Sequence, residues 1–269
     1  MNTILLFVYV RKICMSVFSG LTILTLNLHY IQAQIVNIEE MRITGTIDSL
    51  RWYGALGASF QLAKIQEQTI LFQVESRVQY KKEDNLFLLL LNSELIRAGD
   101  KDFSNSAFAH LRYSRKLSET FAAEAFVQQQ TNKLLLIKSR SLAGLGGRQR
   151  VIIDKTQNSR IYFGSAYLYE YNSYLLEISP KSWHRISNYI SITLRNKKSG
   201  IVLHSTTYWQ PVIGFIKNYR FSSEWNLEFP LWKKIRFSTD LSFSADHGLP
   251  IGAPIEVYEW KNGIVWRLH

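Results

Sequence analysis

The sequence predicts an all-β fold, an up-and-down antiparallel transmembrane β-barrel of about 12 strands. Three observations support this prediction. Many segments alternate residue by residue between polar and apolar side chains, which is the period of a β-strand. An apparent secretory leader precedes these segments. The five prolines all fall between the segments, as expected for a residue with no N–H to donate to a ladder.

The alternation is clearest near the C-terminus. One face of segment 219–229 is polar or charged, and the opposite face is aromatic or aliphatic apart from one serine. The polar face carries Arg220, Ser222, Glu224, Asn226 and Glu228, and the other carries Tyr219, Phe221, Ser223, Trp225, Leu227 and Phe229. Residues 235–244 repeat this pattern, which favours strands with one polar and one apolar face.

The first 33 residues have the features of a secretory signal peptide. Arg11-Lys12 forms a charged region, residues 13–30 are mostly apolar, and a small-residue cleavage site ends at Ala33. A membrane anchor helix is the alternative, because the apolar run is near the spanning length of about 20 residues. Two polar residues interrupt that run and no later segment repeats it, so the sequence favours a leader.

We therefore expect three parts in the chain. Residues 1–33 form the signal peptide, residues 34–50 form a periplasmic N-terminal lead-in, and residues 51–269 form one outer-membrane β-barrel. The only cysteine, Cys14, leaves with the leader, so the mature chain depends on no disulfide.

The net charge is basic, with 32 Lys and Arg against 21 Asp and Glu, a formal charge of +11. The chain shows no zinc-finger, helix-turn-helix or aromatic RNA-binding signature, and the secretory leader argues against nucleic acid as the partner. The expected acidic partners are therefore the phosphates of outer-membrane lipid and lipopolysaccharide.

Twelve segments have the alternation and length of strands, and most exceed the roughly 9–11 residues that a tilted strand needs to cross a bilayer. They are residues 51–63, 68–80, 85–97, 105–115, 119–130, 135–152, 160–172, 185–196, 200–210, 218–229, 233–245 and 256–268. An even count brings both ends of the chain to the same side of the membrane.

The connections between these segments differ in length in a regular way. Short ones are expected at residues 81–84, 116–118, 154–159, 197–199 and 230–232, and longer ones at 98–104, 173–184 and 246–255. With the N-terminus in the periplasm, the short connections become periplasmic turns and the long ones face outward, as in bacterial barrels. Two outward connections, near 64–67 and 131–134, are short as well.

The apolar face is predicted to contact lipid, although a soluble sandwich with the apolar face inside also alternates. Aromatic residues cluster near strand ends, where interfacial girdles lie. The last segment also has the polar, glycine, aromatic and apolar spacing of the signal that barrel assembly machinery reads. This signal consists of Lys261, Gly263, Trp266 and Leu268, and His269 follows it.

Several blocks resemble the domain-of-unknown-function 481 family, whose members are described as salt-induced outer-membrane proteins. Central blocks lie at residues 108–113, 124–135 and 140–150, and the segments 34–39 and 205–211 resemble flanking segments of Bacteroidetes-type members. The resemblance implies an outer-membrane barrel, and it implies no catalytic residues.

A set of charged residues is expected to line the lumen, because all lie on the polar faces of their segments. These are Glu75, Arg77, Arg112, Glu124, Arg140, Arg185, Arg195, Arg220, Glu224, Arg236 and Asp240, and Lys138, Glu170 and Glu228 share the expected face. Rings of charge can form a selective solute path. The alternative is a set of salt bridges that plugs a narrow barrel, since twelve strands lie between the filled eight-stranded and the open sixteen-stranded barrels.

No residues are expected to bind a metal or cofactor or to catalyse a reaction. His110 and His204 are predicted to face inward, without the clustered ligands that a metal needs. A lipid hydrolase needs a serine and a histidine within hydrogen-bond reach on the lipid-facing surface. Ser205 follows His204 and so points to the opposite side of its strand.

The sequence thus predicts an outer-membrane protein of a Gram-negative cell without catalytic activity, possessing no cofactor. A narrow passive channel for small solutes or ions is the first reading. A non-conducting structural or envelope-stress barrel is the second, and an outer-membrane lipid hydrolase is the third.

Overall fold

The structure is a computed structural model that describes residues 51–266, except for 65–67, 100, 155 and 233–234. The predicted signal peptide at 1–33, the lead-in at 34–50 and Leu268 of the predicted assembly signal lie outside the described residues. No helix long and apolar enough to cross a membrane occurs in the described part of the chain.

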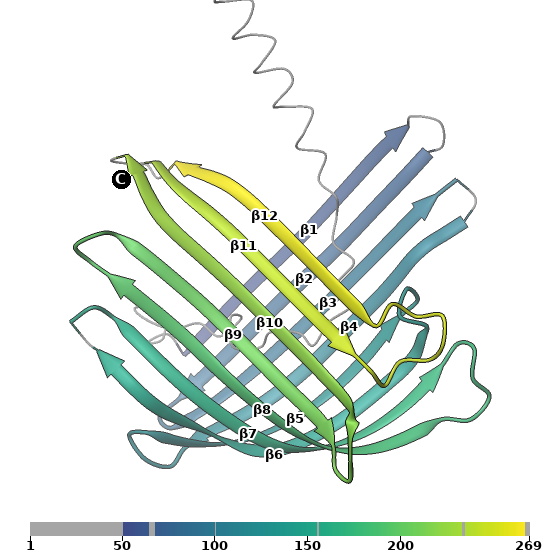
Figure 1. The fold of residues 1–269 in the computed structure, drawn as a ribbon, viewed down its shortest axis with the longest axis horizontal. Helices are drawn as coiled ribbons and strands as arrows, with labels where there is room; N and C mark the ends of the chain where they lie inside the picture. The colour runs from purple at the N-terminus through teal and green to yellow at the C-terminus, as the bar shows by residue number, and fades with distance from the viewer. Residues whose placement is uncertain (1–50, 65–67, 100, 155, 233–234, 267–269) are drawn as a thin grey trace, which may run out of the picture. The chain divides into compact units, whose positions relative to one another are not determined.

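Twelve strands form one antiparallel sheet in which each strand pairs with the next one along the chain (Figure 1). This confirms the predicted all-β, up-and-down fold and its strand number. The strands are β1 (Trp52–Lys64), β2 (Gln68–Lys82), β3 (Asn85–Ala98), β4 (Lys101–Lys116), β5 (Phe121–Asn132), β6 (Ile137–Asp154), β7 (Ser159–Tyr174), β8 (Lys181–Asn196), β9 (Ile201–Val212), β10 (Phe215–Trp232), β11 (Ile235–Asp246) and β12 (Glu256–Trp266).

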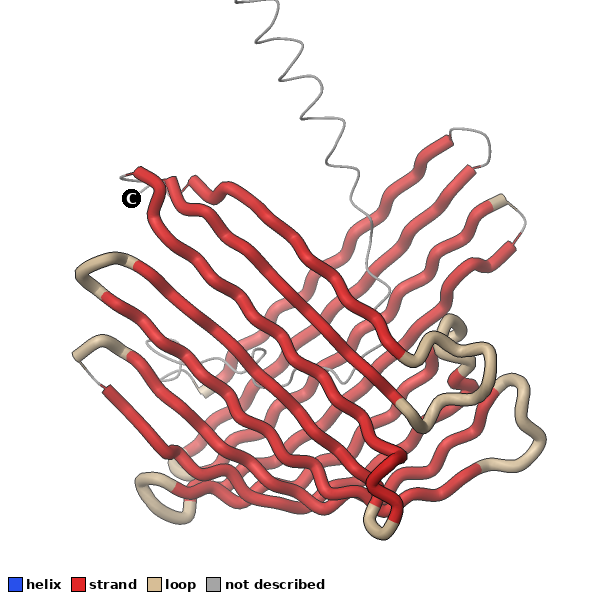
Figure 2. The backbone as a smooth tube through the Cα atoms, in the orientation of Figure 1, coloured by secondary structure: helices blue, strands red, loops and turns tan. Residues whose placement is uncertain are grey.

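The first and last strands are the two ends of this sheet. Within the described residues β1 pairs only with β2, and β12 pairs only with β11. The sheet curves, so that β9 to β12 pass in front of β1 to β4 in the view of Figure 2, which shares the orientation of Figure 1.

Two of the three long loops are shorter than predicted, because the ladders continue past the apolar part of the strands. Asp102 pairs with Arg97, which brings residues 101–104 into β4. Lys181 pairs with Asn172, which brings residues 181–184 into β8. The ladder is made by backbone groups, so a break in the alternation of side chains does not end it. The β11–β12 connection, residues 247–255, is within one residue of the predicted range 246–255.

Two prolines lie inside strands, which corrects the prediction that all five lie between them. Pro211 is next to the end of β9, and Pro230 is near the end of β10. Both lie beside register shifts, between Phe215 and Tyr219 and between Pro230 and Trp232. A regular ladder is interrupted at such places, so a residue without an N–H is tolerated there.

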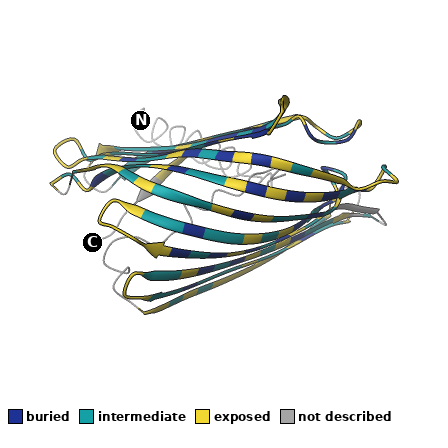
Figure 3. Cartoon of the chain, turned by 90° about the horizontal axis from the view of Figure 1, so that it is seen from below, coloured by how far each residue is buried: buried dark blue, intermediate teal, exposed yellow. Residues whose placement is uncertain are grey.

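The two faces of the sheet differ in composition. Following ladder partners from strand to strand places Arg112, Glu170 and Arg220 on one face, here called the inner face, and the opposite face is the outer face. Buried and exposed residues alternate along the strands (Figure 3). A small apolar cluster of Leu88, Leu90 and Phe108 also lies on the inner face, so this face is mostly but not entirely polar.

Glycine allows one close contact on the inner face. The ring of Tyr189 in β8 lies against Gly164 in β7, its direct ladder partner. A Cβ atom added to Gly164 would lie 2.0 to 2.7 Å from three ring atoms of Tyr189. The ring therefore occupies the space that any other residue would need, and it fills the gap that glycine leaves in a strand.

We expect Gly164→Ala to lower the free energy of unfolding by about 1–3 kcal/mol, because the methyl group overpacks the contact with Tyr189. The matched control is Gly57→Ala in β1, where an added Cβ meets nothing within 4 Å. Urea unfolding of the refolded protein in lipid vesicles measures both. Equal effects of the two substitutions would contradict the packing of Tyr189 on Gly164.

Candidate functional site

The structure places all eleven predicted lumen residues on the inner face. Their positions follow from the register of the ladders, in which partners directly opposite one another share a face. The residues are Glu75, Arg77, Arg112, Glu124, Arg140, Arg185, Arg195, Arg220, Glu224, Arg236 and Asp240. Glu170 and Glu228 share this face, whereas Lys138 lies in a register shift between Ile137 and Ser139 and is exposed.

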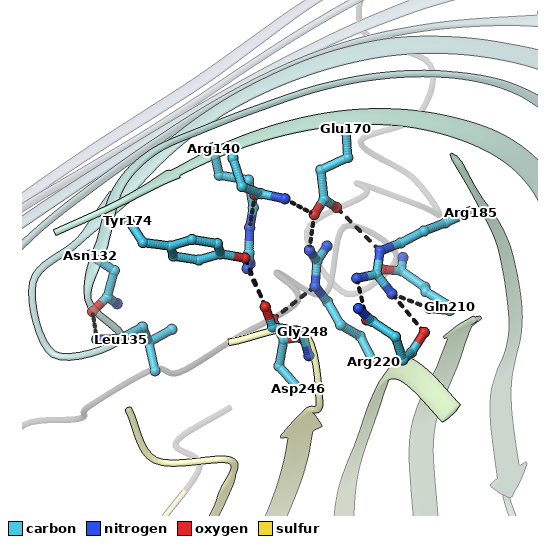
Figure 4. Close-up of polar contacts among 12 residues, drawn as sticks. Asn132, Leu135, Arg140, Glu170, Tyr174, Arg185, Gln210, Arg220, Asp246 and Gly248 are labelled. Carbon is cyan, nitrogen blue, oxygen red and sulfur yellow. Dashed lines mark hydrogen bonds and ion pairs between the residues drawn. The ribbon is translucent and has the colours of Figure 1, made fainter. Parts of the chain in front are cut away.

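Five of the charged residues form one group, the charge cluster, made of Arg140, Glu170, Arg185, Arg220 and Asp246 (Figure 4). All are buried except Asp246, which is partly buried. Arg140 Nη2 and Arg220 Nε lie 3.0 and 2.8 Å from Asp246 Oδ2. Arg220 Nη2 also pairs with Glu170, and Arg185 Nε lies 3.5 Å from Glu170 Oε2. Three guanidinium groups and two carboxylates leave one net positive charge.

The charge cluster crosses the interior of the curved sheet. Arg140 is in β6 and Asp246 ends β11, so their ion pair joins strands that are five positions apart in the sheet order. Such a contact requires the sheet to curve with this face inside. The cluster lies at the end of the sheet where β6, β8 and β10 begin and where β7 and β11 end.

Uncharged groups complete the charge cluster. Arg140 Nε donates to Asn172 Oδ1 at 2.9 Å, and Arg185 Nη2 donates to Asn218 Oδ1 at 2.8 Å. Arg185 Nη1 donates to the backbone oxygen of Gln210 at 2.9 Å. Arg185 and Glu170 are both fully buried, at 0% exposure. Buried charges require such partners, because an unpaired ion in a medium of low polarity costs several kcal/mol.

The β11–β12 loop packs against the charge cluster. Gly248 N donates to Asp246 Oδ1 at 2.9 Å, and Tyr174 Oη donates to the backbone oxygen of Gly248 at 2.9 Å. A Cβ atom on Gly248 would lie 2.9 Å from Arg185 Nη2, so the backbone approaches the guanidinium closely. Leu249 packs against the apolar group of Leu135, Ile137 and Tyr174. The loop is thus attached to the opposite strands β6 and β7.

A second polar network lies on β4 and β5. Arg112 Nη1 lies 2.9 Å from Glu124 Oε2, and Ser114 Oγ donates to Glu124 Oε1 at 3.0 Å. Arg112 Nε also donates to His110 Nε2 at 3.3 Å, and His110 Nδ1 lies 3.1 Å from Gln128 Oε1. The charge cluster and this network are separate pairings of predicted lumen residues.

The other predicted residues make local contacts. Arg236 Nε lies 3.0 Å from Glu228 Oε2, and Asp240 accepts from Asn226 Nδ2 at 2.6 Å. Glu75 accepts from Gln73 at 2.8 Å, and the Arg77 guanidinium lies 5.7 Å from the centre of the Tyr53 ring. Lys261 and Gly263 of the predicted assembly signal lie in β12, and Trp266 is the last residue of that strand.

Two of the described histidines hydrogen-bond to a threonine and to a tyrosine. His204 Nδ1 lies 3.1 Å from Thr193 Oγ1 on the inner face. His184, expected in a loop, lies in β8 on the outer face, where it hydrogen-bonds to Tyr167 Oη at 2.5 Å. Ser182 shares that face and accepts from Tyr169 Oη at 3.4 Å. The described residues also contain no group of three or more His, Cys, Asp or Glu arranged to hold a metal ion.

Sequence reasoning missed Asp246 of the charge cluster and four residues that hydrogen-bond to the cluster, namely Asn172, Gln210, Asn218 and Gly248. Asp246 continues the alternation of Arg236 to Ser244, and this signal could have extended the strand by one residue. The contacts of Asn218 and Gly248 depend on the curvature of the sheet, which the alternation does not specify.

The comparisons with known proteins identify a family. The model of the family described as a protein of unknown function, DUF481, matches residues 56–250. This is most of the chain, so the protein belongs to this family, and the resemblance seen in the sequence is confirmed. No curated protein matches the chain.

Among solved structures, the chain is similar to one described as a NanC porin. The sequence identity is 12%, the TM-score is 0.42, and the similarity covers 81% of this chain and 98% of that chain.

We expect Glu170→Gln to lower the free energy of unfolding by about 3–5 kcal/mol, because it removes the carboxylate that pairs with Arg185 and Arg220 in a buried setting. Glu119→Gln is the control, since Glu119 pairs with Lys116 in an exposed turn and such pairs contribute about 1 kcal/mol or less. Urea unfolding in vesicles compares the two. A similar small effect of both would show that the charge cluster adds no stability.

Proposed function

We propose that this member of the DUF481 family is a bacterial outer-membrane β-barrel and a narrow passive channel for small solutes or ions. The observation that carries the proposal is the division of one twelve-stranded sheet into an apolar outer face and a charged inner face. In a membrane barrel the apolar face contacts lipid and the polar face lines the lumen.

The outer face supports a lipid environment. Each of the twelve strands contributes at least one large apolar side chain that is 42 to 78% exposed. One from each strand, in order, is Leu56, Phe72, Leu91, Leu111, Val127, Leu145, Phe163, Ile190, Trp209, Trp225, Leu241 and Trp260. Soluble proteins rarely expose a continuous apolar surface of this extent.

Closure of the sheet follows from the same environment. Backbone N–H and C=O groups in hydrocarbon must find partners within the protein, and each unpaired group costs several kcal/mol. The outer edges of β1 and β12 offer such groups. With an even number of strands, β1 and β12 run antiparallel, so we propose that they pair with each other in the membrane.

Large side chains fill one part of the inner face and small ones line another, which supports a narrow path for solutes through the barrel. The charge cluster and the β11–β12 loop occupy one end of the interior beside β6 to β11. The inner face of β1 carries small residues instead, including Ala55, Gly57 and Ser59, of which the last two are exposed. We therefore place the solute path beside β1.

The charge cluster also favours a second candidate, a non-conducting envelope barrel. Its members are paired, four of the five are buried, and the Tyr174–Gly248 hydrogen bond holds the β11–β12 loop against it. If side chains and this loop fill the remaining cross-section as well, the barrel is a structural component. Electrical recording separates the two candidates.

We propose export through the N-terminal leader to the outer membrane of a Gram-negative cell, with lipid and lipopolysaccharide around the barrel. The assembly machinery would read the last strand through Lys261, Gly263, Trp266 and Leu268. We propose no catalytic activity and no cofactor, which agrees with the pairing of His184 with a tyrosine and not with a serine.

Planar bilayers containing the refolded protein should show small ohmic current steps. Gly57→Trp should reduce the step size severalfold, because the indole enters the open space beside the inner face of β1. The matched control is Ala58→Trp, the next residue on the outer face, which should leave the step unchanged. Folded protein that carries no current would reject the channel and favour the non-conducting barrel.

A further inference from the structure

Four aromatic residues form a row across the outer face of β1 to β4, near the end where β1 and β3 begin. Trp52 is opposite Tyr80 in the ladder, and Phe87 is opposite both Tyr80 and Tyr113. The ring centres of successive residues lie 4.5, 6.4 and 4.8 Å apart. We call these residues the aromatic row. Aromatic side chains of a lipid-facing surface gather where hydrocarbon meets water, so the row marks this boundary.

A basic row lies directly beyond the aromatic row, toward the ends of the strands. It consists of Lys82, Asn85 and Arg115, in which Asn85 is the ladder partner of both cations. Each lies two residues from a member of the aromatic row on its own strand, so it shares the outer face. Neighbouring strands are about 5 Å apart, which separates the two cations by on the order of 10 Å. Tyr113 Oη donates to Asn85 Oδ1 at 2.6 Å and connects the two rows.

The two cations of the basic row are available for a ligand. Lys82 and Arg115 are exposed, and neither forms an ion pair within the part of the chain that the structure describes. The neighbouring Lys116 differs, because its ammonium lies 2.5 Å from Glu119 in the β4–β5 turn. The charge of Lys116 is therefore balanced locally, and that of the basic row is not.

Two carboxylates lie farther out than the basic row, in the turn that joins β2 and β3. Glu83 and Asp84 make up this turn, and both are exposed. Neither forms an ion pair among the described residues. Along the strand direction the outer face thus presents aromatic rings, then two cations, then two carboxylates.

This order matches the order of groups in a zwitterionic phospholipid. Its acyl chains lie in hydrocarbon, its phosphate lies at the boundary, and its ammonium group lies farther out in water. Lysine and arginine donate charge-assisted hydrogen bonds to phosphate oxygens, and a carboxylate attracts an ammonium. An anionic head group without an ammonium would meet the same carboxylates and be repelled by them.

We propose that the outer face of β2 to β4 at this end binds a phospholipid whose head group carries both a phosphate and an ammonium, as in phosphatidylethanolamine. The phosphate binds between Lys82 and Arg115, and the ammonium faces Glu83 and Asp84. This inference rests on the membrane location proposed above and does not require the barrel to conduct. In the orientation expected from the sequence, this end is periplasmic, so the lipid belongs to the periplasmic leaflet.

Native mass spectrometry of the protein folded in detergent micelles tests the site. With phosphatidylethanolamine and phosphatidylglycerol of the same acyl chains added in equal amounts, the wild type should retain more phosphatidylethanolamine. Lys82→Gln with Arg115→Gln should lower the retained phosphatidylethanolamine at least about fivefold, because both cations that attract the phosphate are lost.

The matched control removes two charges from another exposed turn at the same end. Lys197→Gln with Lys198→Gln changes the β8–β9 turn, where the ladder partners Leu194 and Leu203 stand on the outer face in place of aromatic residues. This pair should leave lipid retention unchanged. If the main double variant does not fold, Lys82→Gln and Arg115→Gln are measured singly, and each should lower retention by a smaller factor.

A second arm tests the ammonium and the acyl chains. Glu83→Gln with Asp84→Asn should abolish the preference, so that phosphatidylglycerol is retained as well as phosphatidylethanolamine. Soluble phosphoethanolamine at the lipid concentration should compete little, because it lacks acyl chains beside the aromatic row. Effective competition by this soluble compound would identify a site for free phosphate compounds and overturn the lipid site.

The outcomes separate this inference from the proposal on which it depends. A wild-type protein that is fully folded in water without detergent or vesicles overturns the membrane location. A protein that folds in micelles but retains both lipids equally overturns only the lipid site. Unchanged retention in Lys82→Gln with Arg115→Gln does the same, and both results leave the barrel intact.

Discussion

The structure depends on the register of eleven antiparallel ladders, because register alone decides which side chains face inward. A shift of one residue in a ladder would turn every charged side chain of that strand to the outer face. The shifts that occur lie mainly near strand ends, as at Pro230, and the ladders between them keep Arg220, Ser222 and Glu224 on one side of β10. In a membrane this constraint is stronger than in water, since a charged residue on the outer face would lie in hydrocarbon.

The charge cluster is a consequence of the register, which keeps charged side chains on the inner face. Charges displaced from lipid must find partners inside, and the curved sheet brings Arg140 and Asp246 together from strands that are far apart in the sheet order. A buried ion pair contributes little net stability relative to an apolar contact, but breaking one is costly. The cluster therefore favours one curvature and one position of the β11–β12 loop, which is also bound through Tyr174 and Leu249.

The sequence predicts the strands and their faces well, because both follow from a local period of two residues. It predicts strand ends less well: residues 101–104 and 181–184 are expected in connections, yet backbone pairing extends through them. Prolines mark the connections between strands except at Pro211 and Pro230, where an irregular register allows proline inside a strand. Gly248 and Asn218 contact Arg185 because the sheet curves and the β11–β12 loop folds over its end. The alternation of polar and apolar residues specifies neither the curvature of the sheet nor the position of the loop.

The central claim is that hydrocarbon covers the outer face, and Leu145→Arg tests it most directly. Leu145 lies in the middle of β6 and is 66% exposed. In lipid, arginine at the centre of a strand should lower the free energy of unfolding by about 2–4 kcal/mol, and the same change near the interface by about 1 kcal/mol or less. Leu117, 59% exposed in the β4–β5 turn, provides the interfacial comparison. Measured by urea unfolding in vesicles, a large loss at Leu145 and a small one at Leu117 is the predicted result. Near-zero losses at both positions would mean that water covers this face, and would contradict the account.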